Sequence, residues 1–337
     1  MPPAIEADEI SEIAFGFMGS KALFVALDLQ VFSILSSGAM SAEAMGKAAG
    51  IHRDRAETLM TALAGLGLLV VKDGAFGNSP AAESFLVKGA KYDFGEYLRL
   101  QVGQQMYGLL DQLGPAVNGT LSKDATASYE QWFSDPEQAR LYSTSQHSGS
   151  LGPARQLAKK IDLTAAEKLL DVGGGTGAFA ITLCKAFDDL SATIVDFPNV
   201  AALGRDYVAK AGLSERIRYV EGNALETRWP EGQDVVLMSY LFSGVPGGSH
   251  AGLIADAHAA LKPGGQVVIH DFIVEEDRSG PELAALWQLQ HTAFTPQARS
   301  VDTGTLGDEL ADGGFDDIQM LEMIPSMTKV AIARRPG

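Results

Sequence analysis

A glycine-rich stretch at residues 169–180, LLDVGGGTGAFA, contains residue types that can hold a nucleotide-like ligand. An apolar run ends in Asp171, and three consecutive glycines at 173–175 separate it from small residues typical of a helix start. Glycine adopts positive φ angles and lets a ligand approach the backbone. A second acid, Asp196, ends the next β-rich run, where an acid meets ribose hydroxyls in dinucleotide folds. The stretch therefore predicts a site for a ribose-containing cofactor, the alternative being a tight turn without a ligand.

Short β-rich runs alternate with helical runs after residue 150, and these elements must position the glycine turn. The β-rich runs cover residues 167–174, 191–198, 217–224, 233–241 and 265–274. Helical runs such as 176–187 and 250–262 separate them. Strands that alternate with helices form a parallel sheet with helices on both faces. We therefore expect an α/β domain over residues 151–337.

Residues 1–150 show a different, mostly helical pattern. Two helical runs, 41–51 and 52–69, precede a hairpin that turns at Asp73-Gly74. Helix, helix and hairpin in this order form the outline of a winged helix. An apolar helix at residues 22–35 can bury one face against a second chain. We interpret residues 1–150 as a dimerisation domain, the alternative from another class being a ligand-sensing or DNA-binding protein without catalysis.

Composition and charge exclude several classes of protein. The chain has 337 residues, 46% of them hydrophobic, and its net charge of −16 argues against a partner with a phosphate backbone. Arg53 and Arg55 stand among acids, so the candidate recognition helix has no basic stripe for DNA. Cys184 is the only cysteine, which excludes an internal disulfide and fits a reducing cytosol. The N-terminus is acidic, unlike a secretory signal, and the longest uninterrupted apolar run, at 61–71, is too short to span a bilayer. We expect a cytoplasmic protein with no nucleic-acid or membrane partner, and we assign no metal ligands.

Four motifs occur in an informative order: LLDVGGGTG, IVDFP, VEGNA and LKPGGQVVIHDF. Together they resemble the class I S-adenosylmethionine-dependent methyltransferases. With the N-terminal winged helix included, nearly the whole chain resembles the small-molecule O-methyltransferase family. The resemblance implies a Rossmann-like, seven-stranded sheet whose final antiparallel hairpin covers residues 315–335. It also implies a homodimer formed through the N-terminal domain.

The resemblance implies S-adenosylmethionine as the methyl donor and S-adenosylhomocysteine as the product. The acid and glycines of the first motif would face the methionine moiety and the ribose edge, and Asp196 would bind the ribose hydroxyls. Asn223 stands where the family usually has an aspartate at the adenine, and Ser239 stands where many relatives have lysine. The implied cofactor-binding residues are Ser150, Asp171, Gly173, Gly174, Gly175, Asp196, Asn223, Ala224 and Ser239.

The resemblance also places a candidate base, His250, in the run GVPGGSHAGLI at a helix start. A hydroxyl acceptor must lose its proton, and a histidine can remove it. Asp271 matches the first of two acids that orient this histidine in plant enzymes, whereas the second position holds Gln297, which carries no charge. The alternative for His250 is a helix-capping or surface histidine. A thioether acceptor has no proton to lose and needs no base.

The implied acceptor pocket combines aromatic and polar side chains. Its residues are Tyr142, Gln146, His147, Trp287, Gln288 and His291, with core packing as the alternative for the aromatic ones. A flat phenol prefers apolar walls, so the polar members favour a small polar acceptor. This lining resembles the bacterial S-methyltransferases that methylate 4-methylthio-2-hydroxybutyrate in dimethylsulfoniopropionate synthesis. The alternative acceptor is a hydroxyl on an aromatic, pigment or antibiotic-type metabolite.

Overall fold

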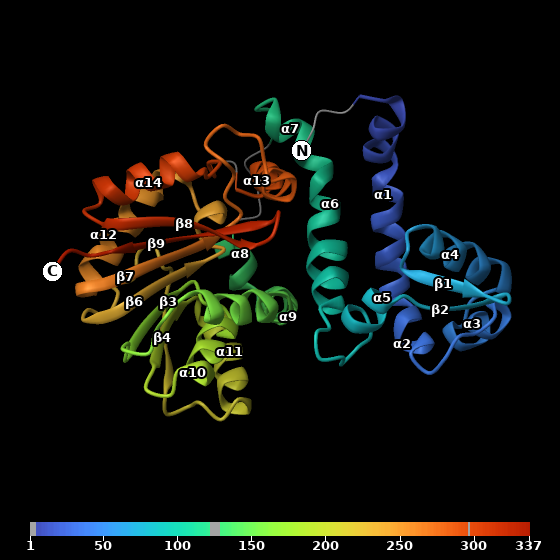
Figure 1. The fold of residues 1–337 in the computed structure, drawn as a ribbon, viewed down its shortest axis with the longest axis horizontal. Helices are drawn as coiled ribbons and strands as arrows, with labels where there is room; N and C mark the ends of the chain where they lie inside the picture. Colours follow the sequence, from blue (N-terminus) through green and yellow to red (C-terminus); the bar gives the residue numbers. More distant parts are fainter. Residues whose placement is uncertain (1–4, 122–128, 296) are drawn as a thin grey trace. The chain divides into compact units, whose positions relative to one another are not determined.

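The fold is described from a computed structural model, for residues 5–121, 129–295 and 297–337. The chain divides into two compact units, one over residues 2–108 and the other over residues 109–337. Figure 1 shows the first unit in blue and cyan and the second in green to red. Each unit is described by itself.

The N-terminal unit contains the predicted winged helix. Its elements are α1 (Ala7–Asp28), α2 (Val31–Leu35), α3 (Ala42–Ala49), α4 (Arg53–Gly65), β1 (Leu69–Lys72), β2 (Ala75–Asn78), α5 (Pro80–Phe85) and the π-helical η1 (Tyr97–Met106). Ser41 caps α3, because its side chain accepts a hydrogen bond from the Ala44 amide. Asp73 and Gly74 both have positive φ angles, 50° and 75°, as a tight hairpin turn requires.

The second unit is built around a seven-stranded sheet. Its strands are β3 (Lys168–Val172), β4 (Ser191–Asp196), β5 (Ile217–Glu221), β6 (Gln233–Ser239), β7 (Leu261–Asp271), β8 (Asp316–Ile324) and β9 (Thr328–Arg334). The order across the sheet is β5-β4-β3-β6-β7-β9-β8. The first five strands are parallel, whereas β9 runs antiparallel to β7 and β8 antiparallel to β9. This arrangement confirms the predicted fold, including the final hairpin.

Helices cover both faces of this sheet and enclose two apolar clusters. On one face α12 (His250–Ala260) and α14 (Thr303–Asp312) bury leucine and isoleucine side chains against β6 and β7. On the other face α10 (Ala178–Ala186) and α11 (Pro198–Lys210) pack with α9 (Pro136–Lys160). The strands β3, β4 and β6 are buried almost throughout, as a sheet covered on both sides requires.

Six further elements of the described residues belong to the second unit: η2 (Leu110–Gln112), α7 (Leu113–Val117), α8 (Tyr129–Ser134), η4 (Phe242–Gly244), η5 (Gly247–Ser249) and α13 (Glu282–Phe294). α9 begins at Pro136, capped by Asp135, which accepts from the amides of Glu137 and Gln138 at 2.8 and 3.0 Å. Because α9 packs along α10 and α11, residues 109–150 join the sheet unit. The structural division therefore falls after Gly108 rather than after Ser150.

The sequence predicts no apolar segment long enough to span a bilayer, but the first helix, α1, is long and apolar enough by length and composition. Among the described residues α1 is one helix whose length and composition would allow it to cross a membrane, although core helices of other proteins pass the same test. Glycine, serine and lysine interrupt the apolar residues of α1, so no long uninterrupted apolar run marks this helix in the sequence. Its exposed apolar side chains include Ile10, Ile13, Phe15, Phe17 and Met18, all more than half exposed.

Candidate functional site

A cavity of about 330 Å³ opens at the carboxyl ends of the parallel strands. In open α/β sheets this edge is where ligands bind, because the loops that leave the strands meet there. The glycine loop after β3, the end of β4, the loop after β5 and the end of β6 all contribute to its lining. All nine predicted cofactor residues line it: Ser150, Asp171, Gly173, Gly174, Gly175, Asp196, Asn223, Ala224 and Ser239.

The glycine loop needs its glycines for two reasons. Gly173 and Gly175 have φ angles of 67° and 59°, in the left-handed region that other residues rarely adopt. Gly174 has an ordinary φ, but a Cβ atom there would lie 2.5 Å from Cγ of Asp171. The loop therefore folds closely over the Asp171 carboxylate, which a side chain at residue 174 would displace.

The Asp171 carboxylate is buried without a partner. The residue is 1% exposed, and neither of its oxygens has a hydrogen-bond partner among the residues that the structure describes. Burial, and secondly the charge of Asp196, raise the pKa of Asp171 to about 7. An unpartnered acid of this kind fits a cationic ligand group. The ammonium of a methionine moiety is such a group, so the site fits S-adenosylmethionine.

Asp196 is held by the backbone around it. Its two carboxylate oxygens accept hydrogen bonds from the amides of Gly175, at 2.7 Å, and Phe197, at 2.8 Å. Burial raises the pKa of Asp196 to about 6, although these two amides oppose the shift. Each oxygen retains a lone pair, so both can still accept from ribose hydroxyls.

Ser239 is tied into the sheet by a histidine that the sequence reasoning missed. The Ser239 hydroxyl lies 2.9 Å from Nδ1 of His270, whose Nε2 lies 2.9 Å from Oγ1 of Thr328. His270 is fully buried in β7, and burial lowers its pKa to about 3, so the ring is neutral. The motif run that contains residue 270 indicated a strand, but the strand pattern alone could not show that the ring bridges two hydroxyls.

One face of α9 lies along the cavity and carries three of the predicted acceptor residues. Tyr142, Gln146 and His147 all line the cavity, one or two turns before Ser150. Nδ1 of His147 lies 2.7 Å from Oγ1 of Thr176 in the glycine loop. Burial lowers the pKa of His147 to about 4, which keeps its ring neutral. Oε1 of Gln146 is buried and has no hydrogen-bond partner in the described part of the chain.

Aromatic rings form a second part of the cavity lining, which we call the acceptor end. Tyr129, Phe133 and Phe294 join Tyr142 in its lining. Tyr129 meets Phe294 edge to face at 4.5 Å between ring centroids, and Phe133 meets Tyr142 at 5.2 Å. Tyr129 and Phe133 were not predicted from the sequence, although their spacing of four residues on one helix was an available signal.

The other three predicted acceptor residues do not line the cavity. Trp287 stacks on Phe272, with centroids 4.3 Å apart and planes 16° apart. Gln288 donates from Nε2 to the backbone oxygens of Phe272 and Val301, at 2.5 and 2.8 Å. His291 is buried near Trp287, and burial lowers its pKa to about 4. Trp287, His291 and Phe294 follow helical spacing and share one face of α13, but only the last turn of the helix, through Phe294, reaches the cavity. The side chains of Trp287, Gln288 and His291 pack or brace the backbone instead.

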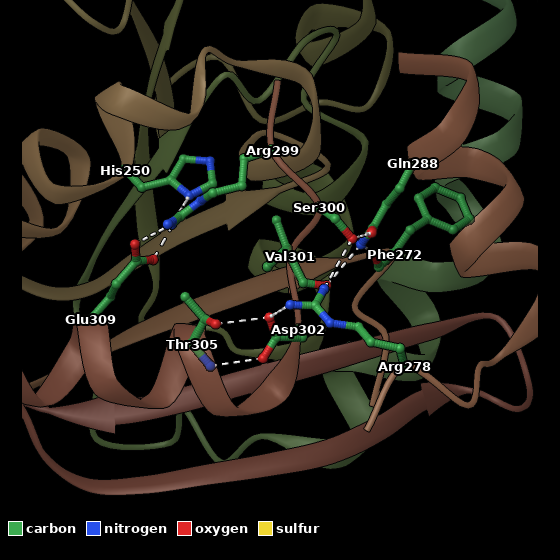
Figure 2. Close-up of polar contacts among 10 residues, drawn as sticks. All are labelled: His250, Phe272, Arg278, Gln288, Arg299, Ser300, Val301, Asp302, Thr305 and Glu309. Atoms are coloured by element: carbon green, nitrogen blue, oxygen red, sulfur yellow. Dashed lines mark hydrogen bonds and ion pairs between the residues drawn. The ribbon is translucent and has the colours of Figure 1, made fainter. Parts of the chain in front are cut away.

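The predicted catalytic pair is not brought together. His250 is 1% exposed and does not line the cavity. Its Nε2 lies 2.9 Å from the oxygen of Phe242, and its Nδ1 lies 3.0 Å from Nη2 of Arg299 (Figure 2). Both ring nitrogens are thus engaged, and no free nitrogen is left to take a proton from an acceptor. Removal of a proton by His250, expected from its place in the motif, is not supported by this arrangement.

Asp271 orients a serine rather than His250. One of its oxygens accepts from the Ser243 hydroxyl at 2.6 Å and from the Phe272 amide at 2.8 Å, and the other accepts from the Ser243 amide at 3.0 Å. Burial raises the pKa of Asp271, and the contacts with Ser243 oppose this shift. The motif match assigned Asp271 to His250. Its actual partner, Ser243, lies seven residues earlier in the chain than His250. Gln297, at the expected second acid position, is exposed and does line the cavity.

Comparisons with known proteins identify the family of this chain. The family model described as the O-methyltransferase domain matches residues 119–303, and the O-methyltransferase dimerisation domain matches residues 11–88. The 3-hydroxy-5-methyl-1-naphthoate 3-O-methyltransferase of Streptomyces sahachiroi is 30% identical over 92% of this chain and 90% of its own length. The tetracenomycin polyketide synthesis 8-O-methyl transferase of Streptomyces glaucescens is 27% identical over 97% and 96%.

A solved structure supports the fold over the full length. The human N-acetylserotonin methyltransferase in complex with S-adenosylmethionine superimposes with a TM-score of 0.86, at 20% identity and with 100% of both chains covered. Family match, fold and cavity therefore agree. The chain belongs to the O-methyltransferase family, and it is a methyltransferase of small molecules that uses S-adenosylmethionine.

Proposed function

We propose that this enzyme methylates a hydroxyl group on a small aromatic metabolite. The observation that carries the proposal is the group of aromatic rings in the cavity lining, formed by Tyr129, Phe133, Tyr142 and Phe294. Flat aromatic ligands pack well against such walls, and the naphthoate and tetracenomycin relatives are named for O-methylation.

The chain contributes mainly binding and orientation to this reaction. S-adenosylmethionine, when bound, supplies an electrophilic methyl group on a sulfonium sulfur. Asp171 and Asp196 would hold its ammonium and ribose, while the aromatic rings and Gln146 would align the acceptor oxygen with the methyl carbon. Holding two reactants in line supplies much of the rate enhancement. As the acceptor oxygen gains the methyl group, the hydroxyl proton would pass to solvent at the open side of the cavity.

A second candidate acceptor is a thioether such as 4-methylthio-2-hydroxybutyrate. The observation that favours it is the engagement of both nitrogens of His250 and its position outside the cavity. A thioether attacks through a lone pair and loses no proton, so it needs no base. The unpartnered Oε1 of Gln146 could accept from a hydroxyl of such an acceptor.

Two further properties follow from the family and the N-terminal unit. We infer that the enzyme is a homodimer, because α1 exposes large apolar side chains and a dimerisation domain matches this region. A second copy that covers α1 would remove this apolar surface from water. A cytoplasmic location is consistent with the single, buried Cys184.

The proposal is tested by methyl transfer from labelled S-adenosylmethionine to a hydroxynaphthoate, a monocyclic phenol and 4-methylthio-2-hydroxybutyrate. Turnover of the aromatic hydroxyls, with little or none of the thioether, is the expected result. Turnover of the thioether alone would replace the first candidate by the second. A rate that rises with pH for the hydroxyl and is flat for the thioether would show which reaction needs a proton to leave.

A further inference from the structure

One wall of the acceptor end is a chain segment that follows α13. We define this wall segment as Thr295 with residues 297–302. Thr295 and Gln297 line the cavity, as do Gly244, Val245 and Pro246 of the loop before α12. The Thr295 hydroxyl donates to the Gly244 oxygen at 3.2 Å, and the Gly247 amide donates to the Gln297 oxygen at 2.8 Å. The wall segment and this loop therefore shape the acceptor end together.

The wall segment and the loop before α12 lie close together. A Cβ atom at Gly247 would lie 2.6 Å from Cβ of Arg299, closer than side chains come in folded proteins. Ala298 forms an antiparallel bridge with Pro246. A shift of the wall segment would therefore change the position of Gln297 and the width of the cavity.

Arg299 connects the wall segment to the first residue of α12 and to α14. Its Nη2 donates to Nδ1 of His250, at 3.0 Å, and also to Oε1 of Glu309 on α14. Figure 2 shows the guanidinium between these two side chains. The second oxygen of Glu309 lies 3.8 Å from Nδ1 of His250. We call His250, Arg299 and Glu309 the clamp.

The contacts define the protonation of His250. A carbonyl oxygen only accepts, so Nε2 must carry the hydrogen that it donates to Phe242. Nδ1 is then a lone pair, which accepts from Arg299. Burial lowers the pKa of His250, and the charge of Arg299 lowers it further, although the Phe242 carbonyl and Glu309 oppose this. The neutral ring is the form that the clamp requires, because a proton on Nδ1 would face the guanidinium.

The far end of the wall segment is held separately. Gln288 donates to the Val301 oxygen at 2.8 Å and accepts from the Ser300 hydroxyl. Asp302 caps α14 through the Thr305 amide at 2.8 Å and pairs with Arg278 at 2.6 Å. Figure 2 shows this second set of contacts beside the clamp. The near end is held by the contacts of Thr295, Gln297 and Ala298 with the loop before α12, and Arg299 holds the part between the two ends.

We propose that the clamp of His250, Arg299 and Glu309 determines which acceptors fit, by holding the wall segment against the loop before α12. His250 is then a positioning residue and takes no proton. The inference rests on the proposed function, since it concerns the acceptor of the same cavity. The proposal gives His250 a structural role, whereas the motif match alone suggests that this buried histidine is a general base.

The test compares Arg299→Ala, Arg299→Lys and His250→Gln with the wild type. Arg228→Ala is the matched control, because Arg228 forms an exposed ion pair with Glu231. In Arg299→Ala we expect the ratio of kcat/KM for 4-hydroxybenzoate to that for 3-hydroxy-1-naphthoate to change about tenfold, since small displacements of a positioned acceptor are costly. Affinity for S-adenosylhomocysteine should stay within about twofold, since the clamp lies outside the cofactor residues.

The conservative variants separate positioning from catalysis. A glutamine at residue 250 offers one donor and one acceptor but no titrating group, so activity should stay within about threefold and keep its pH profile. A loss of about 10²–10⁴-fold in His250→Gln, with loss of a histidine-like pH rise, would show a base and overturn the proposal. Arg299→Lys keeps the charge and the donors, and should restore most of the wild-type selectivity.

Hydrogen–deuterium exchange of the dimer gives a readout that does not depend on turnover. Arg299→Ala should raise exchange at residues 244–247 and 297–302 and leave the glycine loop at 173–177 unchanged. Unchanged exchange and unchanged selectivity would both count against the clamp. If the wild type methylates neither aromatic acid, the proposed function fails for this class, and the exchange measurement still decides whether the clamp holds the wall segment.

Discussion

The cofactor end and the acceptor end of one cavity differ in how they are built. At the cofactor end, the key groups are at strand ends, in the glycine loop and on its backbone amides, such as the Gly175 amide that binds Asp196. At the acceptor end, side chains come from α8, α9, α13 and the wall segment. Backbone geometry therefore determines the first end, and the packing of separate helices determines the second. The cofactor end can therefore keep the same cofactor while the side chains of the acceptor end change to suit a different substrate.

The largest effect should come from removing the charge of Asp171. Asp171→Asn keeps the size of the side chain but leaves no anion for an ammonium group. Hydrogen bonds to charged groups contribute about 1.5–3 kcal/mol, so affinity for S-adenosylhomocysteine should fall about 10–150-fold in calorimetry. Asp189→Asn, at an exposed position, is the control and should bind like the wild type. Equal affinities for the wild type and Asp171→Asn would remove this carboxylate from the cofactor end.

The next prediction concerns pH at the same end. The pKa of Asp171 is raised to about 7 and that of Asp196 to about 6, so both carry protons in part of the free enzyme below neutral pH. An ammonium group binds the ionised form, and affinity for S-adenosylhomocysteine should rise as the pH increases from 5 to 7 and then level off, by up to about tenfold per pH unit.

The same shifts affect stability with the opposite sign. A carboxyl whose folded-state pKa is raised stabilises the fold at low pH, and this contribution is lost as the pH rises toward 7. The free enzyme should therefore lose stability between pH 4 and 7, and S-adenosylhomocysteine should raise Tm more at pH 8 than at pH 5.5. Asp171→Asn should flatten both profiles, and a profile that stays steep would assign the titration to another group.

A third prediction concerns the aromatic end. Phe294→Leu keeps an apolar side chain but removes the ring that meets Tyr129 edge to face. A ring pair between Phe294 and an aromatic acceptor would contribute about 0.5–1.5 kcal/mol beyond its buried area, so KM for that acceptor should rise about 3–10-fold. Affinity for S-adenosylhomocysteine should not change, and a parallel loss of both would contradict the separation of the two ends.

This difference also explains what the sequence could predict. Asp171, the glycines and Asp196 belong to strand-turn-helix motifs, so their meeting at one sheet edge follows from local pattern and topology. Trp287 and Phe294 share one face of α13, and which turn of that face reaches the cavity depends on packing, so the sequence pattern suits both residues equally. His250 was assigned by its position at the start of α12, but the partners of its ring include Arg299 and Glu309, two residues far along the chain. Sequence spacing contains no information about such contacts.

The smallest effect on catalysis should come from Trp287, which the sequence pattern assigned to the acceptor pocket. Its ring stacks on Phe272 outside the cavity lining, so its contribution is to packing. Trp287→Phe keeps a stacked ring of smaller area and should lower the free energy of unfolding by about 1 kcal/mol, measured by denaturant titration. KM for the acceptor should stay within about twofold, in contrast to Phe294→Leu. A rise in KM that matches the effect of Phe294→Leu, with stability unchanged, would mean that Trp287 contacts the acceptor, and the aromatic end would then include the earlier turn of α13 that packs on Phe272.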